Sequence, residues 1–322
     1  MTYARIAGIG SFLPEKVLTN KDLEGMMETS DEWIRERTGI KRRHLVSEGE
    51  TTSSLAVEAA RRALEMADTD PSEIDLIVVG TCTPDKVMPA VACMVQRQLG
   101  IVGCGAIDLN AACSGFVYGL DYANRYLITG GGKKALVIGA ETLSRIVDWE
   151  DRTTAVLFGD GAGAVVLEIA EEPGILATHI HANGAYEDLL QTRHGVSLGF
   201  DASCDRGATI EMNGNAVFKR AVSTFDAMTR ETIADLDGHL DDIDWFIPHQ
   251  ANMRIITAAA KKLGMPMDRV IATVDEHANT SGASIPLALD LAVRDGRIKR
   301  GDMLLMAAFG AGFTWGSAML RF

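Results

Sequence analysis

The hydrophobic and polar positions of the chain predict alternating strands and helices. Residues 105–112 (GAIDLNAA) form a short apolar run typical of a buried strand. The next segment, 114–128, has apolar residues three to four positions apart, a spacing that predicts an amphipathic helix. The runs 133–141 (KKALVIGAE) and 302–309 (DMLLMAAF) are typical of strands in buried, parallel-type sheets, with helices between and outside them.

The pattern occurs twice along the chain. Four pairs of segments recur in the same order, shifted by between 164 and 169 residues. These pairs are 72–82 with 241–250, 96–100 with 260–264, 112–116 with 279–283, and 133–141 with 301–310. A fifth pair, 158–169 with 309–320, fits if the second half lacks about one strand. We therefore predict two copies of one α/β unit, residues 1–172 and 173–322, that meet at the turn signal Glu171–Gly174.

Cys113 is the first candidate for chemistry. It lies where the predicted strand 105–112 meets the predicted helix 114–128, among small residues. Unpaired N–H groups and the helix dipole at such a junction favour a thiolate, so we expect a lowered pKa and a reactive sulfur. On its own, Cys113 fits a buried structural cysteine better than a reactive one.

The duplication brings other candidates toward Cys113. By the pairing of segments, Cys113 faces Thr280 at the start of the equivalent helix. His249 follows the predicted strand 244–247, and Asn279 precedes Thr280. Alone, His249 fits a loop histidine and Asn279 fits a helix N-cap. Taken together, the repeat predicts that Cys113, His249 and Asn279 converge.

Composition limits the classes of function. The 322 residues are 47% hydrophobic and carry a net charge of −13, which gives ample core and argues against a nucleic-acid partner. The first residues show neither a signal peptide nor a membrane span. Five cysteines without paired spacing suit a reducing, cytoplasmic location.

Two kinds of binding site are not expected from the motifs. The histidines and cysteines show no HxxxH or CxxC metal pattern, so we expect no metal. FGDGAGA (158–164) lacks the Gly-Lys-Ser/Thr of a P-loop and precedes a strand-like run, so it does not indicate a nucleotide loop.

Motifs along the whole chain resemble one family. In order, these are TSDEWI (29–34), RTGI (37–40), NAACSGF (110–116), FGDGAGA (158–164), IPHQAN (247–252), NTSGASIP (279–286) and FGAGFTWGSA (309–318). The chain is similar in these motifs to β-ketoacyl-[acyl carrier protein] synthase III, the initiating condensing enzyme of type II fatty-acid synthesis, within the thiolase-like superfamily. The resemblance implies a duplicated αβαβα five-layer α/β fold.

The resemblance also implies a reaction and its residues. An acyl-CoA primer condenses with malonyl-[acyl carrier protein], with loss of CO2, and no cofactor is expected. Cys113 would carry the acyl group, and His249 and Asn279 would donate hydrogen bonds to the enolate. The oxyanion hole would be the backbone N–H groups of Cys113 and Ala311, where many relatives have glycine; alanine is strained there only if φ is positive.

Further roles follow from the family's pattern. Trp33 and Arg152 would sandwich the adenine of coenzyme A, with Thr29 and Arg37 nearby and Asn252 along the pantetheine tunnel. Trp149 is a rival surface aromatic. Phe309 would gate the nucleophile, although a core phenylalanine fits equally. Met88 stands where many relatives have a phenylalanine that closes the partner's acyl pocket.

An acidic carrier protein requires a local basic patch on an acidic chain. The candidates are Lys219, Arg220, Arg254, Lys261 and Lys262. An ordinary solvated face is the alternative for these residues. The family forms homodimers, and residues 87–100 are the expected interface segment.

Two other functions stay open. One is a related acyl-CoA condensing enzyme of signal or secondary-metabolite synthesis, which turnover with a non-carrier acceptor would reveal. The other is a non-catalytic subunit of a heterodimer. Such subunits usually lose the cysteine or the histidine, and this chain has both.

Overall fold

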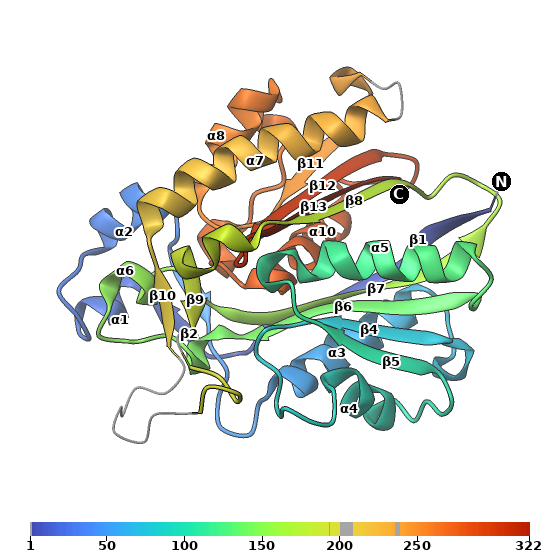
Figure 1. Cartoon of the computed structure of the whole chain (residues 1–322), viewed down its shortest axis with the longest axis horizontal. Coiled ribbons are helices and arrows are strands. Elements are labelled where there is room, and N and C mark those ends of the chain that lie inside the picture. Colours follow the sequence, from blue (N-terminus) through green and yellow to red (C-terminus); the bar gives the residue numbers. More distant parts are fainter. Residues whose placement is uncertain (1, 193, 200–208, 236–238) are drawn as a thin grey trace.

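The computed structural model describes residues 2–192, 194–199, 209–235 and 239–322. Two mixed sheets form its frame (Figure 1). The first has the order β1 (Tyr3–Phe12), β7 (Asp160–Ala170), β6 (Lys134–Thr142), β4 (Leu76–Gly80) and β5 (Gly105–Leu109). The second has the order β8 (Ile175–Ala182), β13 (Thr314–Arg321), β12 (Met303–Gly310) and β11 (Trp245–Pro248).

The two sheets share one strand order, which makes the duplication visible. In each, the central strand β6 or β12 pairs parallel with β4 or β11 and antiparallel with β7 or β13. The predicted strands are confirmed, but the expectation of parallel-type sheets is wrong. β13 returns from β12 through a short connection, which produces an antiparallel neighbour, and β7 lies in the equivalent place although residues 143–159 separate it from β6. The predicted boundary, 172/173, falls in the turn between β7 and β8.

The chain that the second half lacks lies after its central strand, because residues 311–313 join β12 to β13 whereas residues 143–159 join β6 to β7. A single parallel bridge from Phe246 to Val270 stands where the first half has β5. β5 itself is an edge strand and is only partly covered in this chain, so the expectation that it is buried is wrong for the single chain.

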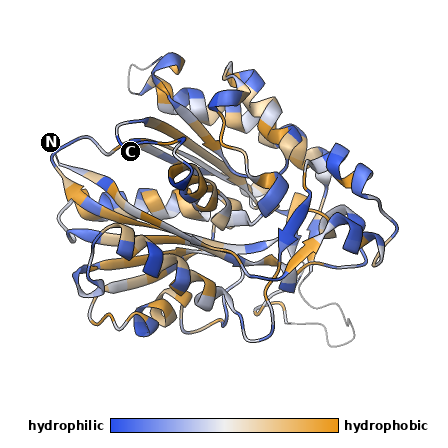
Figure 2. Ribbon diagram, turned by 180° about the vertical axis from the view of Figure 1, so that it is seen from behind, coloured by the Kyte–Doolittle hydropathy of each residue, from blue (hydrophilic) through white to orange (hydrophobic). Residues whose placement is uncertain are grey.

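Helices form three layers around the sheets (Figure 1). The central pair contacts both sheets, and one pair covers each outer face. The central pair is α5 (Gly115–Ile128) and α10 (Ser284–Arg294); the outer pairs are α3 (Thr52–Met66) with α4 (Val91–Gln98), and α7 (Gly214–Ala234) with α8 (Met253–Leu263). Figure 2 shows hydrophobic residues concentrated on the strands and on the helix between the sheets. The result is the five-layer αβαβα arrangement of the prediction.

Short elements gather at one end of the frame, opposite the two termini (Figure 1). They are β2 (Val17–Thr19), α1 (Asn20–Glu24), α2 (Asp31–Thr38), β3 (Arg42–His44), α6 (Arg152–Ala155), β9 (Leu190–Thr192), β10 (Ile210–Met212) and α9 (Val274–His277). Ser30 caps α2 by accepting a hydrogen bond from the backbone N–H of Trp33 at 3.1 Å. No helix in the described ranges is long and apolar enough to cross a bilayer.

Candidate active site

Two tight turns meet at the centre of the molecule. η2 (Ala112–Ser114) leads into α5, and η7 (Ser281–Ala283) leads into α10; the two turns contact each other. Ala112 and Ser281 hold equivalent places and both have a positive φ, +46° and +49°. This equivalence pairs Cys113 with Gly282, so the pairing of Cys113 with Thr280 was wrong by two residues.

Cys113 lies in η2 and is 8% exposed. The end of β12 reaches it so closely that a Cβ on Gly310 would stand 2.7 Å from the Cys113 nitrogen. Glycine is therefore required at position 310. Burial raises the pKa of the Cys113 thiol to about 12, although the neighbouring Ser281 hydroxyl lowers it in part. The expectation of a lowered pKa is wrong for the free chain, because loss of hydration outweighs the helix N-terminus.

His249 follows β11 and is 2% exposed. Its backbone N–H donates to the carbonyl of Ala307 at 2.8 Å, and its Nδ1 lies 2.6 Å from the Ser284 hydroxyl. Burial lowers the pKa of His249 to about 3, so the ring is neutral near pH 7. A Ser284 hydroxyl that donates to Nδ1 leaves the ring proton on Nε2, which then is a hydrogen-bond donor. The sequence analysis missed Ser284, which lies in the NTSGASIP motif.

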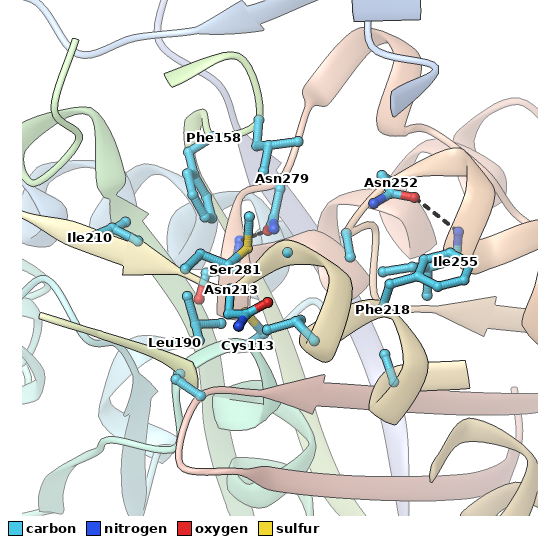
Figure 3. A pocket seen from close by; sticks show the side chains of 18 of the residues that line it. Cys113, Phe158, Leu190, Ile210, Asn213, Phe218, Asn252, Ile255, Asn279 and Ser281 are labelled. Atoms are coloured by element: carbon cyan, nitrogen blue, oxygen red, sulfur yellow. Dashed lines mark hydrogen bonds between the residues drawn. The ribbon is translucent and has the colours of Figure 1, made fainter. Parts of the chain in front are cut away.

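Asn279 is 7% exposed and is fixed on both sides. Its backbone pairs with Leu157 and Gly159, and its Oδ1 accepts a 2.9 Å hydrogen bond from the Ser281 N–H. Because Oδ1 is used as an acceptor, the amide nitrogen is left to donate (Figure 3). Asn279 is therefore the anchor of the η7 turn and does not cap a long helix.

One cavity of about 980 Å³ joins these side chains. Its walls include Cys113, His249, Asn279, Phe309 and Ala311. The β9 and β10 strands and the start of α7 form another wall, which the sequence analysis did not identify (Figure 3). A cavity of this size accommodates an extended, drug-sized ligand.

Ala311 and Phe309 lie on the wall next to the nucleophile. Ala311 does not have a positive φ, so alanine is unstrained there; the positive φ of this turn belongs to Gly312, at +128°. Phe309 is 5% exposed and tilts against Phe313, with ring centroids 4.6 Å apart.

The predicted coenzyme A residues gather at one end of the cavity. Trp33, Arg37 and Asn252 line it, whereas Thr29 and Arg152 do not. The guanidinium of Arg152 lies 5.0 Å from the centre of the Trp33 ring, and that of Arg37 lies 5.8 Å away. Arg152 therefore occupies the stacking position itself, and an adenine between the two side chains requires Arg152 to move.

Three further candidates have contacts of their own. The Thr29 hydroxyl is buried without a hydrogen-bond partner. Asn252 lines the cavity and also caps α8, since its Oδ1 accepts a hydrogen bond from the Ile255 N–H at 2.9 Å (Figure 3). Trp149 is half-buried, and its indole N–H donates to the Ser144 carbonyl, so it is not a free surface aromatic.

The five basic candidates lie on α7 and α8, which pack together, and all are exposed. Of the five, only Arg254 lines the cavity, with its guanidinium 5.5 Å from the Phe218 ring. Arg220 stacks on Tyr186, and the Lys262 ammonium lies 3.6 Å from Asp226. Lys219 and Lys261 lie outside the cavity.

Met88 is not part of its own chain's cavity wall. It is 79% exposed and does not line the cavity. Its neighbour Val87 is 70% exposed and Val102 is 93% exposed. Cys82, Cys93, Cys104 and Cys113 are free thiols; the fifth candidate, Cys204, lies outside the described residues.

Two family models match the sequence. "3-Oxoacyl-[acyl-carrier-protein (ACP)] synthase III" covers residues 107–184, and its C-terminal counterpart covers 233–322. The chain is 62% identical to beta-ketoacyl-[acyl-carrier-protein] synthase III of Thioalkalivibrio sulfidiphilus, over all of both chains. The crystal structure of 3-oxoacyl-[acyl-carrier-protein] synthase III from Aquifex aeolicus matches with a TM-score of 0.93 and 47% identity, covering 99% of this chain and 100% of that one.

A structure from another pathway also matches. The priming beta-ketosynthase of the R1128 polyketide biosynthetic pathway gives a TM-score of 0.95 at 36% identity, covering 99% of this chain and 96% of that one. The shared fold therefore includes an enzyme named for a polyketide pathway, whereas the higher identities are to relatives named as synthase III.

Proposed function

The chain belongs to the 3-oxoacyl-[acyl-carrier-protein] synthase III family, and we propose that it uses Cys113, His249 and Asn279 for the family's reaction. This reaction is the initiating condensation of fatty-acid synthesis, in which an acyl-CoA and malonyl-[acyl carrier protein] give a β-ketoacyl-[acyl carrier protein], CoA and CO2. The observation that carries the proposal is the cavity that Cys113 shares with the neutral hydrogen-bond donors His249 and Asn279.

In the first half-reaction, Cys113 attacks the acyl-CoA carbonyl. The carbonyl oxygen becomes negative, and the backbone N–H groups of Cys113 and Ala311 are the proposed donors to it. The close approach of Gly310 to Cys113 supports this assignment, because it brings the next residue, Ala311, beside the nucleophile. CoA then leaves, and the acyl group stays on the sulfur as a thioester.

In the second half-reaction, the malonyl group loses CO2 and becomes an enolate. The donors proposed for its oxygen are His249 Nε2–H and the Asn279 amide nitrogen. Both are neutral, so they stabilise a developing negative charge without changing their own protonation. The enolate carbon attacks the acyl thioester, and the Cys113 sulfur leaves. No resident cofactor or metal enters these steps.

Substrate binding is proposed at the mouth of the cavity. Trp33 and Arg152 would hold the adenine after Arg152 moves aside, and Arg37 and Thr29 would contact the nucleotide end. Asn252 would follow the pantetheine arm. The cation–π contacts of Trp33 with Arg37 and Arg152 support a stacking site there.

Partners and location are also proposed. The basic candidates on α7 and α8 would dock the acidic carrier protein beside Arg254 at the cavity. The adjacent residues Val87 and Met88 support a homodimer, because both are strongly exposed and exposed apolar patches mark interfaces. A cytoplasmic location fits the free thiols of the described residues.

Mass spectrometry of the intact protein tests the proposal. After exposure to a panel of acyl-CoAs, we expect the mass of one acyl group on the native chain and none on Cys113→Ala. Malonyl-[acyl carrier protein] should then remove the acyl group. Acylation on another cysteine, Cys204 included, would contradict the nucleophile. Release only by a non-carrier acceptor would favour the secondary-metabolite alternative.

A further inference from the structure

Glu141 is a buried carboxyl group that the mechanism above does not use. It lies at the end of β6 and is 0% exposed. Its oxygens accept hydrogen bonds from Thr83 at 2.5 Å, from Thr81 at 3.2 Å and from the N–H and thiol of Cys82 at 3.2 to 3.4 Å. No salt bridge to this carboxyl exists within the described part of the chain. Such a group needs an explanation, because burying a carboxyl is costly.

Two glycines explain how Glu141 reaches the site. A Cβ on Gly139 would stand 2.1 Å from the carbonyl oxygen of Gly282, so β6 and the η7 turn touch backbone to backbone. This close approach places Glu141, two residues after Gly139, against Ser281 in η7. The Ser281 hydroxyl donates to Glu141 Oε1 at 3.1 Å.

Ser281 also lies beside the nucleophile. Its hydroxyl is near enough to the Cys113 thiol to influence the pKa of that thiol, and both residues line the cavity (Figure 3). A hydroxyl has one proton to donate and can accept another hydrogen bond. Because Ser281 donates to Glu141, it can accept from the Cys113 S–H. The three groups thus form a chain from sulfur to carboxylate.

We propose that Glu141 takes up the thiol proton of Cys113 through the Ser281 hydroxyl when Cys113 attacks an acyl donor. This inference deepens the proposed function and rests on it for the identity of the acyl donor. Glu141 acts through Ser281, so it is a positioning residue for the proton and does not touch the substrate. Burial raises the pKa of Glu141, which makes its carboxylate a stronger base than an exposed one.

The proton and electron pairs balance over the step. The sulfur pair forms the S–C bond while the thiol proton moves to Ser281 Oγ, and the Ser281 proton moves to Glu141 Oε1. When the tetrahedral intermediate collapses, the C–S bond to CoA breaks and that sulfur leaves with the pair. The proton returns from Glu141 along the same path and yields CoA thiol. Glu141 ends the step as a carboxylate.

The negative charge of Glu141 and its role as a proton acceptor have opposite effects on the reactivity of Cys113. Removing the charge therefore distinguishes the two roles. The negative charge disfavours a thiolate on Cys113. If charge alone mattered, Glu141→Gln would make Cys113 more reactive. If the proton chain matters, the same change makes Cys113 less reactive near neutral pH. The titratable groups facing Glu141 are Cys82, after β4, and Cys113 in η2. The neutral His249 lines the same cavity.

The probe is iodoacetamide, with the rate of Cys113 alkylation followed by mass spectrometry and peptide mapping between about pH 6 and pH 10. For Glu141→Gln we expect a rate lower by about 10²-fold at pH 7, the typical contribution of a positioned base. The deficit should shrink as pH rises, because hydroxide then removes the thiol proton. An unchanged or faster rate at pH 7 would overturn the proposal.

Two further variants separate the proton chain from folding. Thr81→Val removes another donor to the same carboxyl and should keep the native pH profile. Ser281→Ala should reproduce the loss, and the double variant should be no slower than either single variant. Additive losses, or a native rate in Ser281→Ala, would overturn the chain even if Glu141→Gln fails to fold. Alkylation that depends on Glu141 without acylation by any acyl-CoA would instead refute the proposed function alone.

Discussion

At the scale of single residues, burial keeps the side chains of Cys113 and His249 uncharged. Cys113 holds its proton because its pKa is raised to about 12, and His249 is neutral because its pKa is lowered to about 3. A raised thiol pKa means that Cys113 is protonated throughout the neutral range. A lowered histidine pKa means that the ring gains a proton only in strong acid. The resting site therefore carries neither a thiolate nor an imidazolium.

The two donors can be tested apart from the nucleophile. We expect His249→Ala and Asn279→Ala to be acylated on Cys113 but to condense about 10²- to 10³-fold more slowly, because each removes one donor to the enolate. Intact mass measures the first half-reaction, and formation of the β-ketoacyl product measures the second. Cys113→Ala is the matched control: it should lose acylation and keep malonyl decarboxylation. Loss of acylation in the donor variants would contradict the division of roles.

At the scale of elements, glycine contacts and tight turns place the site. Gly310 brings the end of β12 against Cys113, and Gly139 brings the end of β6 against η7. The helices α7 and α8 pack together beside the cavity and carry the basic candidates. Because Arg254 lines the cavity, reversing its charge would affect the binding of both substrates. Lys219 and Lys261 lie outside the cavity and offer the cleaner test.

We expect Lys219→Glu with Lys261→Glu to raise the KM for malonyl-[acyl carrier protein] about 10-fold at low salt. The carrier is anionic, so the effect should shrink as ionic strength rises. The rate of acylation by acyl-CoA should stay native, because neither side chain lines the cavity. Equal losses in both half-reactions would show that these lysines support the fold. Steady-state kinetics at two salt concentrations provide the measurement.

At the scale of the whole molecule, the single chain leaves an apolar region uncovered. Met88 is 79% exposed and lies outside its own cavity wall, so any role in an acyl pocket must be in a partner's pocket. Methionine is unbranched and adapts to irregular space, whereas phenylalanine is rigid. A methionine wall should admit longer primers, with each buried methylene contributing up to about 0.8 kcal/mol.

Met88→Phe tests this interpretation. We expect the ratio of acylation rates to shift toward acetyl-CoA over hexanoyl-CoA or octanoyl-CoA, because a rigid ring shortens the pocket. Val102→Ala, another exposed apolar change, should leave the ratio as it is. Size-exclusion chromatography at several concentrations checks that both variants keep the native assembly. An unchanged ratio in Met88→Phe would show that Met88 does not set the depth of the pocket.

The sequence by itself determined the layered fold and the set of candidate residues. The repeat of apolar runs predicted two copies of one unit, and the sheets share one strand order. Cys113, His249 and Asn279 were predicted to converge, and the structure places them on one cavity. Patterns of this kind are local: each strand or helix shows its periodicity within a dozen residues, and duplication then relates distant positions without further information.

Only the tertiary structure decided the protonation of those residues and the contacts that hold them in place. The pKa of Cys113 depends on how completely its neighbours remove water, which no local pattern records. The pairing of Cys113 with Gly282 followed from backbone angles, and the Glu141–Ser281 contact joins residues 140 positions apart. The guanidinium of Arg152 in α6 lies over the ring of Trp33 in α2, so this contact joins two separate helices. Desolvation and long-range contacts depend on the whole packed chain, so they appear only when the chain is folded.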